Sequence, residues 1–302
     1  MLRQRPAPPV TRLGRLLGCA LLLGALGCPP GRAAACTLFG LAGPADVAGG
    51  GTIIVKNRDW RPDQTQSLSL VTPEDGYRYL GLFAVGGGAD GLKAGVNEKG
   101  LAAVTATVSS IPREERKAEK GISGILRRLL AQCASVEEAV ARADLFANAK
   151  PCFYMLADRH GIARVETAPG GKFAVTRLAA GPLWQTNHYL EPALAADNRR
   201  LGASSQARAA RIQALLAQVG KPASLDALLA VSRDTAGGPD NGIWRTGSTP
   251  TATRTMATFA VALPASGTAT LYLRTADPGA PERVLSLKLP ENAPFPSVDK
   301  KP

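Results

Sequence analysis

The sequence is poor in histidine and in clustered cysteine, which narrows the metal chemistry that it could carry. It has two histidines, His160 and His188, and its five cysteines include no CxxC pair. Zinc and related metals need several such ligands at short spacings. We therefore expect no metal site and no cofactor.

The chain also has no basic run with interleaved aromatic residues. Aromatic residues make up 5% of the chain, and the basic residues behind its formal charge of +12 are scattered. We therefore expect no nucleic-acid partner. The apolar run Leu16–Leu26 is too short to span a bilayer, which takes roughly 20 residues. A hydrophobic content of 45% is ordinary for a globular domain with a sizeable core.

The first 35 residues have the three parts of a secretory signal peptide. A basic segment precedes Leu16–Leu26, Pro29-Pro30-Gly31 ends the apolar run, and Ala33 and Ala35 are the small residues of a cleavage site. A cut between Ala35 and Cys36 would make Cys36 the first residue. We predict that residues 1–35 are a signal peptide and that the protein is exported, either to the periplasm or out of the cell.

A second interpretation of this segment uses a different cysteine. Ala25-Leu26-Gly27-Cys28 resembles a lipoprotein cleavage box, and lipidation at Cys28 would anchor the protein to the envelope membrane. Cys36 would then lie eight residues into the chain, and self-cleavage would be needed to free it. We favour the cut before Cys36, because it places a reactive residue at the new N-terminus. A membrane partner is expected only if Cys28 is lipidated.

An N-terminal Cys36 would carry a thiol and a free α-amine on one residue. The amine has a reference pKa of about 7.7–8.0 and the thiol one of about 8.5. The amine can therefore accept the thiol proton near neutral pH without a histidine. This pairing favours an N-terminal-nucleophile amidohydrolase acting on a small acylated amide.

The residue pattern alternates between strands and helices along one domain, residues 36–290, followed by a loose tail at 291–302. The predicted strands are Thr37–Leu41, Thr52–Asn57, Ser67–Val71, Leu92–Val96, Leu101–Ser109, Phe153–Asp158, Ile162–Thr167, Lys172–Arg177, Leu183–Thr186, Thr255–Leu263, Ala269–Arg274 and Val284–Leu289. The predicted helices are Ile122–Cys133, one from the capping box at Ser135 to Leu145, Asn198–Val219 and Ser224–Ser232. Two antiparallel sheets between two helix layers, an αββα sandwich, would bury every apolar face. A simpler α+β fold also fits this order.

Two polar stretches could support a nucleophilic thiol. In Lys56-Asn57-Arg58-Asp59, the Asp59 carboxylate could hold the amine, while Lys56 or Arg58 could favour the thiolate. A surface turn with an Arg–Asp pair fits the same spacing. In the second stretch, Asn187 could donate its amide N–H to a tetrahedral oxyanion.

Two further candidates lie next to or after Asn187. His188 could act as a base for Cys36, or it could be an ordinary packing histidine. Arg208 could hold a thiolate or carboxylate, or it could lie on a solvated helix face. Cys133 and Cys152 could form a disulfide, or they could be two buried thiols.

Taken together, residues 36–290 resemble the choloylglycine hydrolase and isopenicillin-N acyltransferase branch of the N-terminal-nucleophile hydrolases. The resemblance rests on Cys36-Thr37, Gly51–Trp60, Gly95–Leu101, Thr186-Asn187-His188 and the Ser204–Arg211 segment. It implies an αββα sandwich and amide cleavage through a thioester.

In that family pattern Cys36 is the nucleophile, Asp59 holds its amine, Asn187 serves the oxyanion and Arg208 lies near the thiol. The chain departs from the pattern at Lys56, where relatives often have arginine. It also has no evident second oxyanion asparagine, since threonines stand in that region.

We therefore predict an exported cysteine amidohydrolase or acyltransferase. Water would release the acyl group in the first case and an amine in the second. Two alternatives stay open: a non-catalytic envelope lipoprotein tethered at Cys28, and a Cys36/His188 thiol hydrolase. A homo-oligomer is compatible with the sequence.

Overall fold

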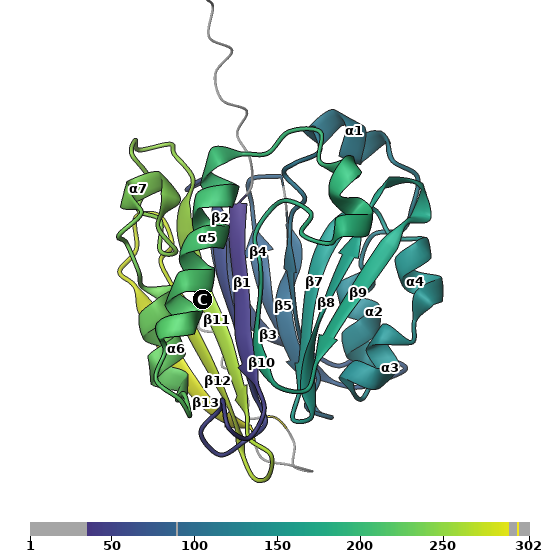
Figure 1. Cartoon of the computed structure of the whole chain (residues 1–302), viewed down its shortest axis with the longest axis vertical. Helices are drawn as coiled ribbons and strands as arrows, with labels where there is room; N and C mark the ends of the chain where they lie inside the picture. Colours follow the sequence, from purple (N-terminus) through teal and green to yellow (C-terminus); the bar gives the residue numbers. More distant parts are fainter. Residues whose placement is uncertain (1–34, 89, 290–294, 296–302) are drawn as a thin grey trace, which may run out of the picture. The chain divides into compact units, whose positions relative to one another are not determined.

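The computed structural model describes residues 35–88, 90–289 and 295, which belong to one compact unit (Figure 1). The predicted signal peptide up to residue 34 lies outside the described residues, and so does the predicted tail except for Phe295. Phe295 is partly buried and packs against the central core.

The first sheet has six antiparallel strands and contains Cys36 near the start of β1. In spatial order the strands are β10 (Gly181–Gln185), β1 (Ala35–Ala42), β2 (Thr52–Trp60), β11 (Arg254–Leu263), β12 (Ala269–Thr275) and β13 (Arg283–Leu289). The turn between β1 and β2 contains Gly49, Gly50 and Gly51, all with positive φ, a conformation that glycine adopts without strain. The register places Ala35 opposite Asp59 and Cys36 opposite Arg58.

The second sheet has seven antiparallel strands in sequence order. They are β3 (Thr65–Val71), β4 (Tyr79–Val85), β5 (Gly91–Asn97), β6 (Ala102–Ala106), β7 (Cys152–Asp158), β8 (Gly161–Thr167) and β9 (Phe173–Leu178). Each strand pairs with the next one along the chain, so short hairpins or longer helical excursions connect neighbours.

Three apolar clusters show how the layers stack. The largest joins both sheets and includes Leu38, Ile54, Val104 and Met155. A second packs the β3–β9 sheet against α2 (Ile125–Gln132), α3 (Val136–Val140) and α4 (Ala143–Ala147). The third packs the β10–β13 sheet against α5 (Ala203–Gln218) and α6 (Leu225–Ser232). The helix layers on the two outer faces confirm the predicted αββα sandwich.

Several predicted boundaries were wrong for local reasons. The helix predicted from Ile122 begins at Ile125, because Gly124 has left-handed backbone with φ of 80°. The helix predicted from Asn198 begins at Ala203. Asn198 instead exchanges hydrogen bonds with the backbone of Tyr189 through its side chain and ends the 3-10 helix Pro192–Asp197.

Other elements extend or add to the prediction. The helix predicted from Ser135 to Leu145 is interrupted at Arg142, which has ψ of 54°. Strand β2 continues through Asp59 to Trp60, and β4 was not predicted at all. The short helices α1 (Arg113–Ala118) and α7 (Gly238–Asn241) and the 3-10 turn Pro169–Gly171 were also not predicted. Over the described ranges, every helix is too short or too polar to cross a membrane.

Candidate active site

Cys36 lies at the second position of β1, between β10 and β2, and its side chain is 6% exposed. Its Sγ lies 3.8 Å from the Nζ of Lys56 on the neighbouring strand. In this chain the Cys36 nitrogen is a peptide N–H, and it donates to the side-chain oxygen of Asn187 at 3.0 Å. Its carbonyl accepts from Arg208 at 2.7 Å. Both backbone groups of Cys36 are therefore held by predicted site residues.

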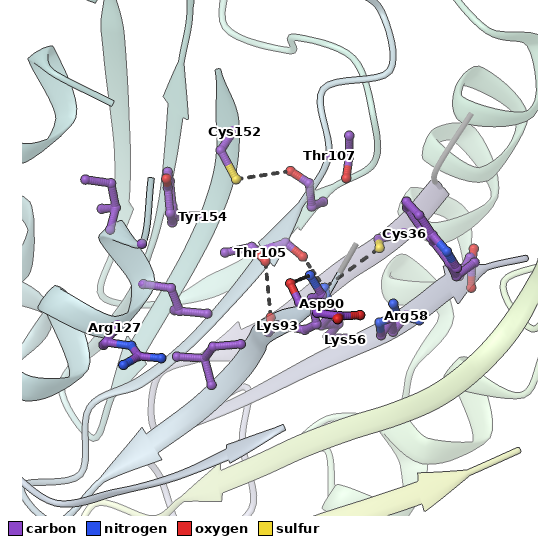
Figure 2. A pocket seen from close by; sticks show the side chains of 18 residues that line it. Cys36, Lys56, Arg58, Asp90, Lys93, Thr105, Thr107, Arg127, Cys152 and Tyr154 are labelled. Atoms are coloured by element: carbon purple, nitrogen blue, oxygen red, sulfur yellow. Dashed lines mark hydrogen bonds between the residues drawn. The ribbon is translucent and has the colours of Figure 1, made fainter. Parts of the chain in front are cut away.

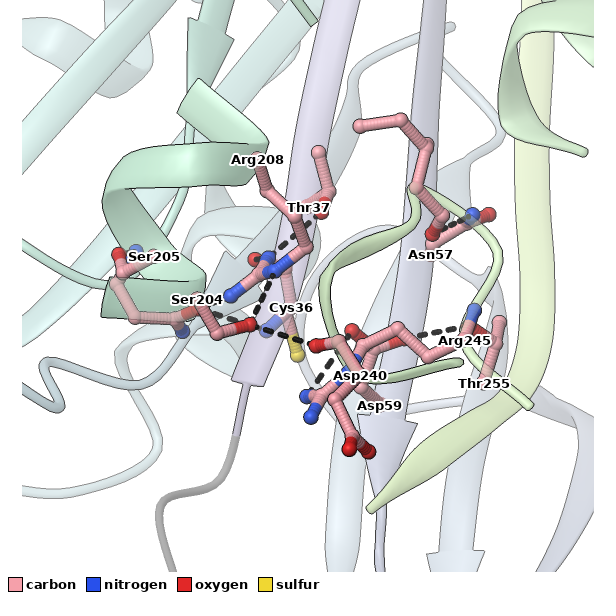
Figure 3. A network of polar contacts seen from close by, with 12 residues as sticks. Cys36, Thr37, Asn57, Asp59, Ser204, Ser205, Arg208, Asp240, Arg245 and Thr255 are labelled. Atoms are coloured by element: carbon pink, nitrogen blue, oxygen red, sulfur yellow. Dashed lines mark hydrogen bonds and ion pairs between the residues drawn. The ribbon is translucent and has the colours of Figure 1, made fainter. Parts of the chain in front are cut away.

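Arg208 projects from α5 and is fully buried (Figure 3). Its Nη1 donates to the Cys36 carbonyl and to the Thr37 hydroxyl, each at 2.7 Å, and its Nη2 donates to Asn187 Oδ1 at 2.8 Å. Burial lowers its pKa to about 10, opposed by nearby Asp59, so the guanidinium stays charged at neutral pH. A solvated helix face is excluded for Arg208. Its partners are the Cys36 carbonyl, Thr37, Asn187 and, at 3.4 Å from Nε, the Ser204 hydroxyl.

Asn187 follows β10, and its side-chain orientation is fixed by its partners. The guanidinium of Arg208 can only donate, so the atom that it contacts is the Asn187 oxygen. The Asn187 nitrogen donates to the carbonyl of Thr107 at 2.8 Å. An amide nitrogen carries two hydrogens, so one N–H remains for a developing oxyanion.

Asp59 is completely buried at the end of β2 rather than in a surface turn. Its Oδ1 accepts from the Thr255 hydroxyl at 2.8 Å, and its Oδ2 lies 3.9 Å from Arg245 Nη1. Among the described residues, Oδ2 has no hydrogen-bond donor. Burial raises the pKa of Asp59, and the charges of Arg245 and Arg208 oppose that rise. The carboxylate therefore keeps a free acceptor oxygen in a water-poor place, and in the register this residue faces Ala35.

Lys56 is 1% exposed, and its ammonium bonds the carbonyl of Thr105 in addition to approaching Cys36 Sγ. Burial lowers the pKa of Lys56, and the negative charge available at Cys36 opposes that shift. A cation at this distance favours a thiolate. The other two supporting candidates on β2 have different partners. Asn57 ties the sheet to the carbonyls of Ser232 and Ile243, and Arg58 bonds Gln64.

The polar contacts of the His188 ring are to residues other than Cys36. Its Nδ1 lies 2.8 Å from Ser205 Oγ and 3.3 Å from Thr186 Oγ1. Burial and the charge of Arg208 lower the pKa of His188. Within the described part of the chain, no hydrogen bond joins His188 to Cys36. The geometry does not bring together the parts of a Cys36/His188 dyad.

Cys133 and Cys152 are free thiols in the structure, and of the two interpretations that the sequence left open it does not contain the disulfide. Cys133 follows α2 and is buried in the helix-side apolar cluster. Cys152 begins β7, lies in contact with the Ala106 carbonyl and lines the pocket that contains Cys36. Cys133 is therefore packed as a small apolar group, whereas Cys152 is half-buried and borders the pocket.

A pocket of about 390 Å³ lies in front of the thiol (Figure 2). Its walls come from β1, β2, β5, β6 and β7 and from the first turn of α2. Sequence analysis missed several of its polar residues, namely Trp60, Asp90, Lys93, Thr105, Thr107, Arg127 and Tyr154. The one signal was Lys93, a charge within the predicted strand Leu92–Val96. Burial, together with the charges of Arg58 and Lys56, lowers the pKa of Lys93 to about 8.

Comparison with known families agrees with this geometry. A family model of acyl-coenzyme A:6-aminopenicillanic acid acyl-transferase matches residues 47–278, more than half of the chain. The chain belongs to this family. It is therefore a C–N amide hydrolase or acyltransferase of the N-terminal-nucleophile type. The matched range contains Asp59, Asn187 and Arg208 and begins downstream of Cys36.

One of the solved structures compared shares the fold at low sequence identity. An N-acylethanolamine-hydrolyzing acid amidase ortholog from Caenorhabditis elegans has a TM-score of 0.51 and 13% identity, covering 76% of this chain and 93% of that chain. A variant of conjugated bile acid hydrolase from Clostridium perfringens has a TM-score of 0.49 and 15% identity, covering 83% of this chain and 92% of that chain. No curated protein sequence matches the chain.

Proposed function

We propose that the protein is exported to the periplasm or secreted, that a cut after Ala35 makes Cys36 N-terminal, and that its thiol cleaves a small acyl amide through a thioester. The observation that carries this proposal is the surroundings of the Cys36 nitrogen. Asn187 accepts its hydrogen, and the preceding residue, Ala35, pairs across the strands with Asp59, whose buried Oδ2 has no donor among the described residues. Removing Ala35 would create a terminal amine next to the strand position of this carboxylate.

After the proposed cut, the reaction uses the new Cys36 amine together with side chains that are already in place. The amine takes the thiol proton, and Lys56 stabilises the thiolate, which attacks the amide carbonyl. The remaining N–H of Asn187 donates to the oxyanion. The ammonium of Cys36 returns its proton to the leaving amine as the C–N bond breaks, which leaves the acyl group on Sγ. Water in a hydrolase, or an amine in an acyltransferase, then attacks the thioester and restores the thiol.

Two chains that differ by one residue test the role of the amine. One begins at Cys36, and the other carries one added serine before it. Both chains are incubated with a chromogenic amide, and acylation of Cys36 is measured by intact mass. We expect the first chain to be acylated and the acylation rate of the second to be at least roughly a hundredfold lower. Equal acylation of both chains would contradict the proposal. His188→Ala is the companion variant, and we expect it to keep its acylation rate.

The N-terminus of the exported protein tests the location and the cut. Intact mass and N-terminal sequencing of protein from the periplasm or medium should give a chain that begins at Cys36. A chain that stays lipidated at Cys28 would overturn this part of the proposal and would favour an anchored protein.

A further inference from the structure

The pocket in front of Cys36 has more positive charge than the proposed catalytic steps use, since Lys56 is the one basic residue that those steps assign. The pocket lining contains four basic residues and two acidic residues, Asp59 and Asp90. The basic residues are Lys56, Arg58, Lys93 and Arg127. Asp59 is already bonded to Thr255. The positive charges also disfavour one another, since Arg58 lowers the pKa of both Lys56 and Lys93. An anionic ligand would relieve this repulsion.

Arg58 is the member of this group that is built to bind a ligand. Its side chain is 2% exposed, and two of its nitrogens, Nε and Nη1, have no hydrogen-bond acceptor among the described residues. Its Nη2 is held by the side-chain oxygen of Gln64, which in turn donates to the carbonyl of Gly86 at 2.6 Å. The guanidinium also lies 5.6 Å from the ring centroid of Trp60. The orientation of the guanidinium is therefore fixed, while the N–H groups of Nε and Nη1 stay free on two different edges, each of which includes Nη2.

The free groups around Arg58 are donors, whereas the free acceptor of this pocket, Asp59 Oδ2, belongs to the proposed amine site. Besides the two Arg58 nitrogens, the indole Nε1 of Trp60 is buried without an acceptor among the described residues, and Trp60 lines the same pocket. Buried donors without partners carry a desolvation cost that an acceptor-rich ligand removes. A carboxylate offers two acceptor oxygens that match a guanidinium edge.

The strand register and the attachment of the acyl group to Cys36 indicate which part of the substrate carries this carboxylate. Arg58 lies directly opposite Cys36 across the β1–β2 pair, on the same face of the sheet. In the proposed thioester the acyl group stays attached to Cys36 Sγ, in the pocket that both residues line, while the amine departs. The anionic group therefore belongs to the acyl part and lies a few bonds from its carbonyl.

We propose that the enzyme prefers amides of short acyl chains that end in a carboxylate, such as a succinyl or glutaryl group, and that Arg58 binds this carboxylate with Lys93 beside it. This inference rests on the function proposed above, because it assigns the substrate class of that site. Arg58 acts here in acyl recognition, separately from the amine and oxyanion groups around Asp59 and Asn187.

Turnover of two matched anilides tests the preference. Glutaryl and pentanoyl 4-nitroanilide have the same leaving amine and acyl chains of equal length. We expect the wild-type kcat/KM to be at least roughly tenfold higher for the glutaryl compound, the effect of one charge-assisted pair. Arg58→Gln should abolish this preference by slowing the glutaryl compound at least roughly tenfold more than the pentanoyl compound. Arg58→Lys should keep part of it, and Arg61→Gln, which removes a half-exposed arginine paired with Asp63, should keep all of it.

Binding gives a readout that does not depend on catalysis. Calorimetry with free glutarate and with neutral pentanamide, on Cys36→Ala protein, should show glutarate binding that Arg58→Gln weakens roughly tenfold or more. Three results would overturn the acyl preference. Wild type could turn over the pentanoyl compound as fast as the glutaryl compound or faster, Arg58→Gln could lose turnover of both anilides equally, or glutarate could fail to bind at millimolar concentration. Glutarate binding without any acylation of Cys36 would instead support the anion site and overturn the proposed chemistry.

Discussion

Replacing Asp59 with asparagine should separate the catalytic role of this residue from its effect on stability. Asparagine keeps the oxygen that accepts from Thr255 but replaces Oδ2 with a donor nitrogen. The amine of an N-terminal Cys36 would then lose its charged acceptor. A hydrogen bond to a charged group contributes about 1.5–3 kcal/mol, so we expect kcat/KM to fall roughly tenfold to a hundredfold.

The stability of the uncut chain should change in the opposite direction. Burial raises the pKa of Asp59 in the folded protein above its usual 3.8, even with Arg245 and Arg208 opposing. A carboxyl group whose folded pKa is raised destabilises the fold once it ionises, so its contribution falls as pH rises from about 4 through the folded value. Asparagine cannot ionise. The Asp59→Asn chain should therefore be at least as stable as wild type at pH 7.

Urea unfolding of both uncut chains from pH 4 to pH 7, together with activity of the mature forms, measures both effects. The difference in unfolding free energy should grow in favour of the variant as pH rises. Asp63→Asn is the matched control, since its ion pair with Arg61 is half-exposed and contributes at most about 1 kcal/mol. A variant that is less stable than wild type at pH 7, or one with unchanged activity, would refute the reasoning.

Three further substitutions test the remaining contacts. Lys56→Met removes the cation 3.8 Å from Cys36 Sγ, which favours the thiolate. The rate of Cys36 alkylation at pH 7, measured by mass spectrometry, should therefore fall roughly tenfold. An unchanged rate would count against a charge effect. Arg208→Lys keeps the charge but loses the fork that makes three buried hydrogen bonds, so the unfolding free energy in urea should fall by about 2–4 kcal/mol. A loss below about 1 kcal/mol would show that lysine replaces the fork. His188→Ala removes a hydrogen bond to Ser205 and should lower the unfolding free energy by about 1 kcal/mol. The acylation rate should stay within roughly threefold of wild type. Loss of acylation in folded protein would support His188 as the base.

The layers of this fold could be predicted because their signals are local. The apolar stripe of α2 reports its one buried face, and the Ser135 side chain does accept from the Glu138 N–H as its capping box predicts. The small and β-branched residues of β6 predict a strand, although both of its faces are buried. Strand β4 was missed because its run from Tyr79 to Val85 contains little alternation and a glycine. A Cβ at that glycine, Gly81, would lie 2.6 Å from the side chain of Leu92, so its reason is packing against a neighbouring strand.

The site was less predictable, because burial decides what its residues do. On spacing alone, Asp59 and Arg208 fitted a surface turn and a solvated helix face. The structure buries both completely, through pairing of β2 with β11 and packing of α5 on the sheet. The pocket lining was harder still to predict from the sequence. Lys93 and Arg127 reach the pocket from separate elements, and the residues next to each in the sequence do not indicate that the two share a site. The assignment of Cys36, Asp59, Asn187 and Arg208 to catalytic roles stays a prediction that the variants above test.

The alternation of β1 divides the chemistry of Cys36 between two environments. The thiol faces the space between the sheets, with Lys56 and Arg58 on the same face, whereas the next side chain, Thr37, faces α5 and bonds Arg208. The Cys36 nitrogen is held from the α5 side through Asn187. Substitutions on the pocket side should therefore change thiol reactivity and acyl preference with little effect on the amine. Substitutions on the helix side should change the amine and the stability of β1 while the acyl preference stays constant, because Thr37 and Arg208 lie on the opposite face of β1 from the thiol.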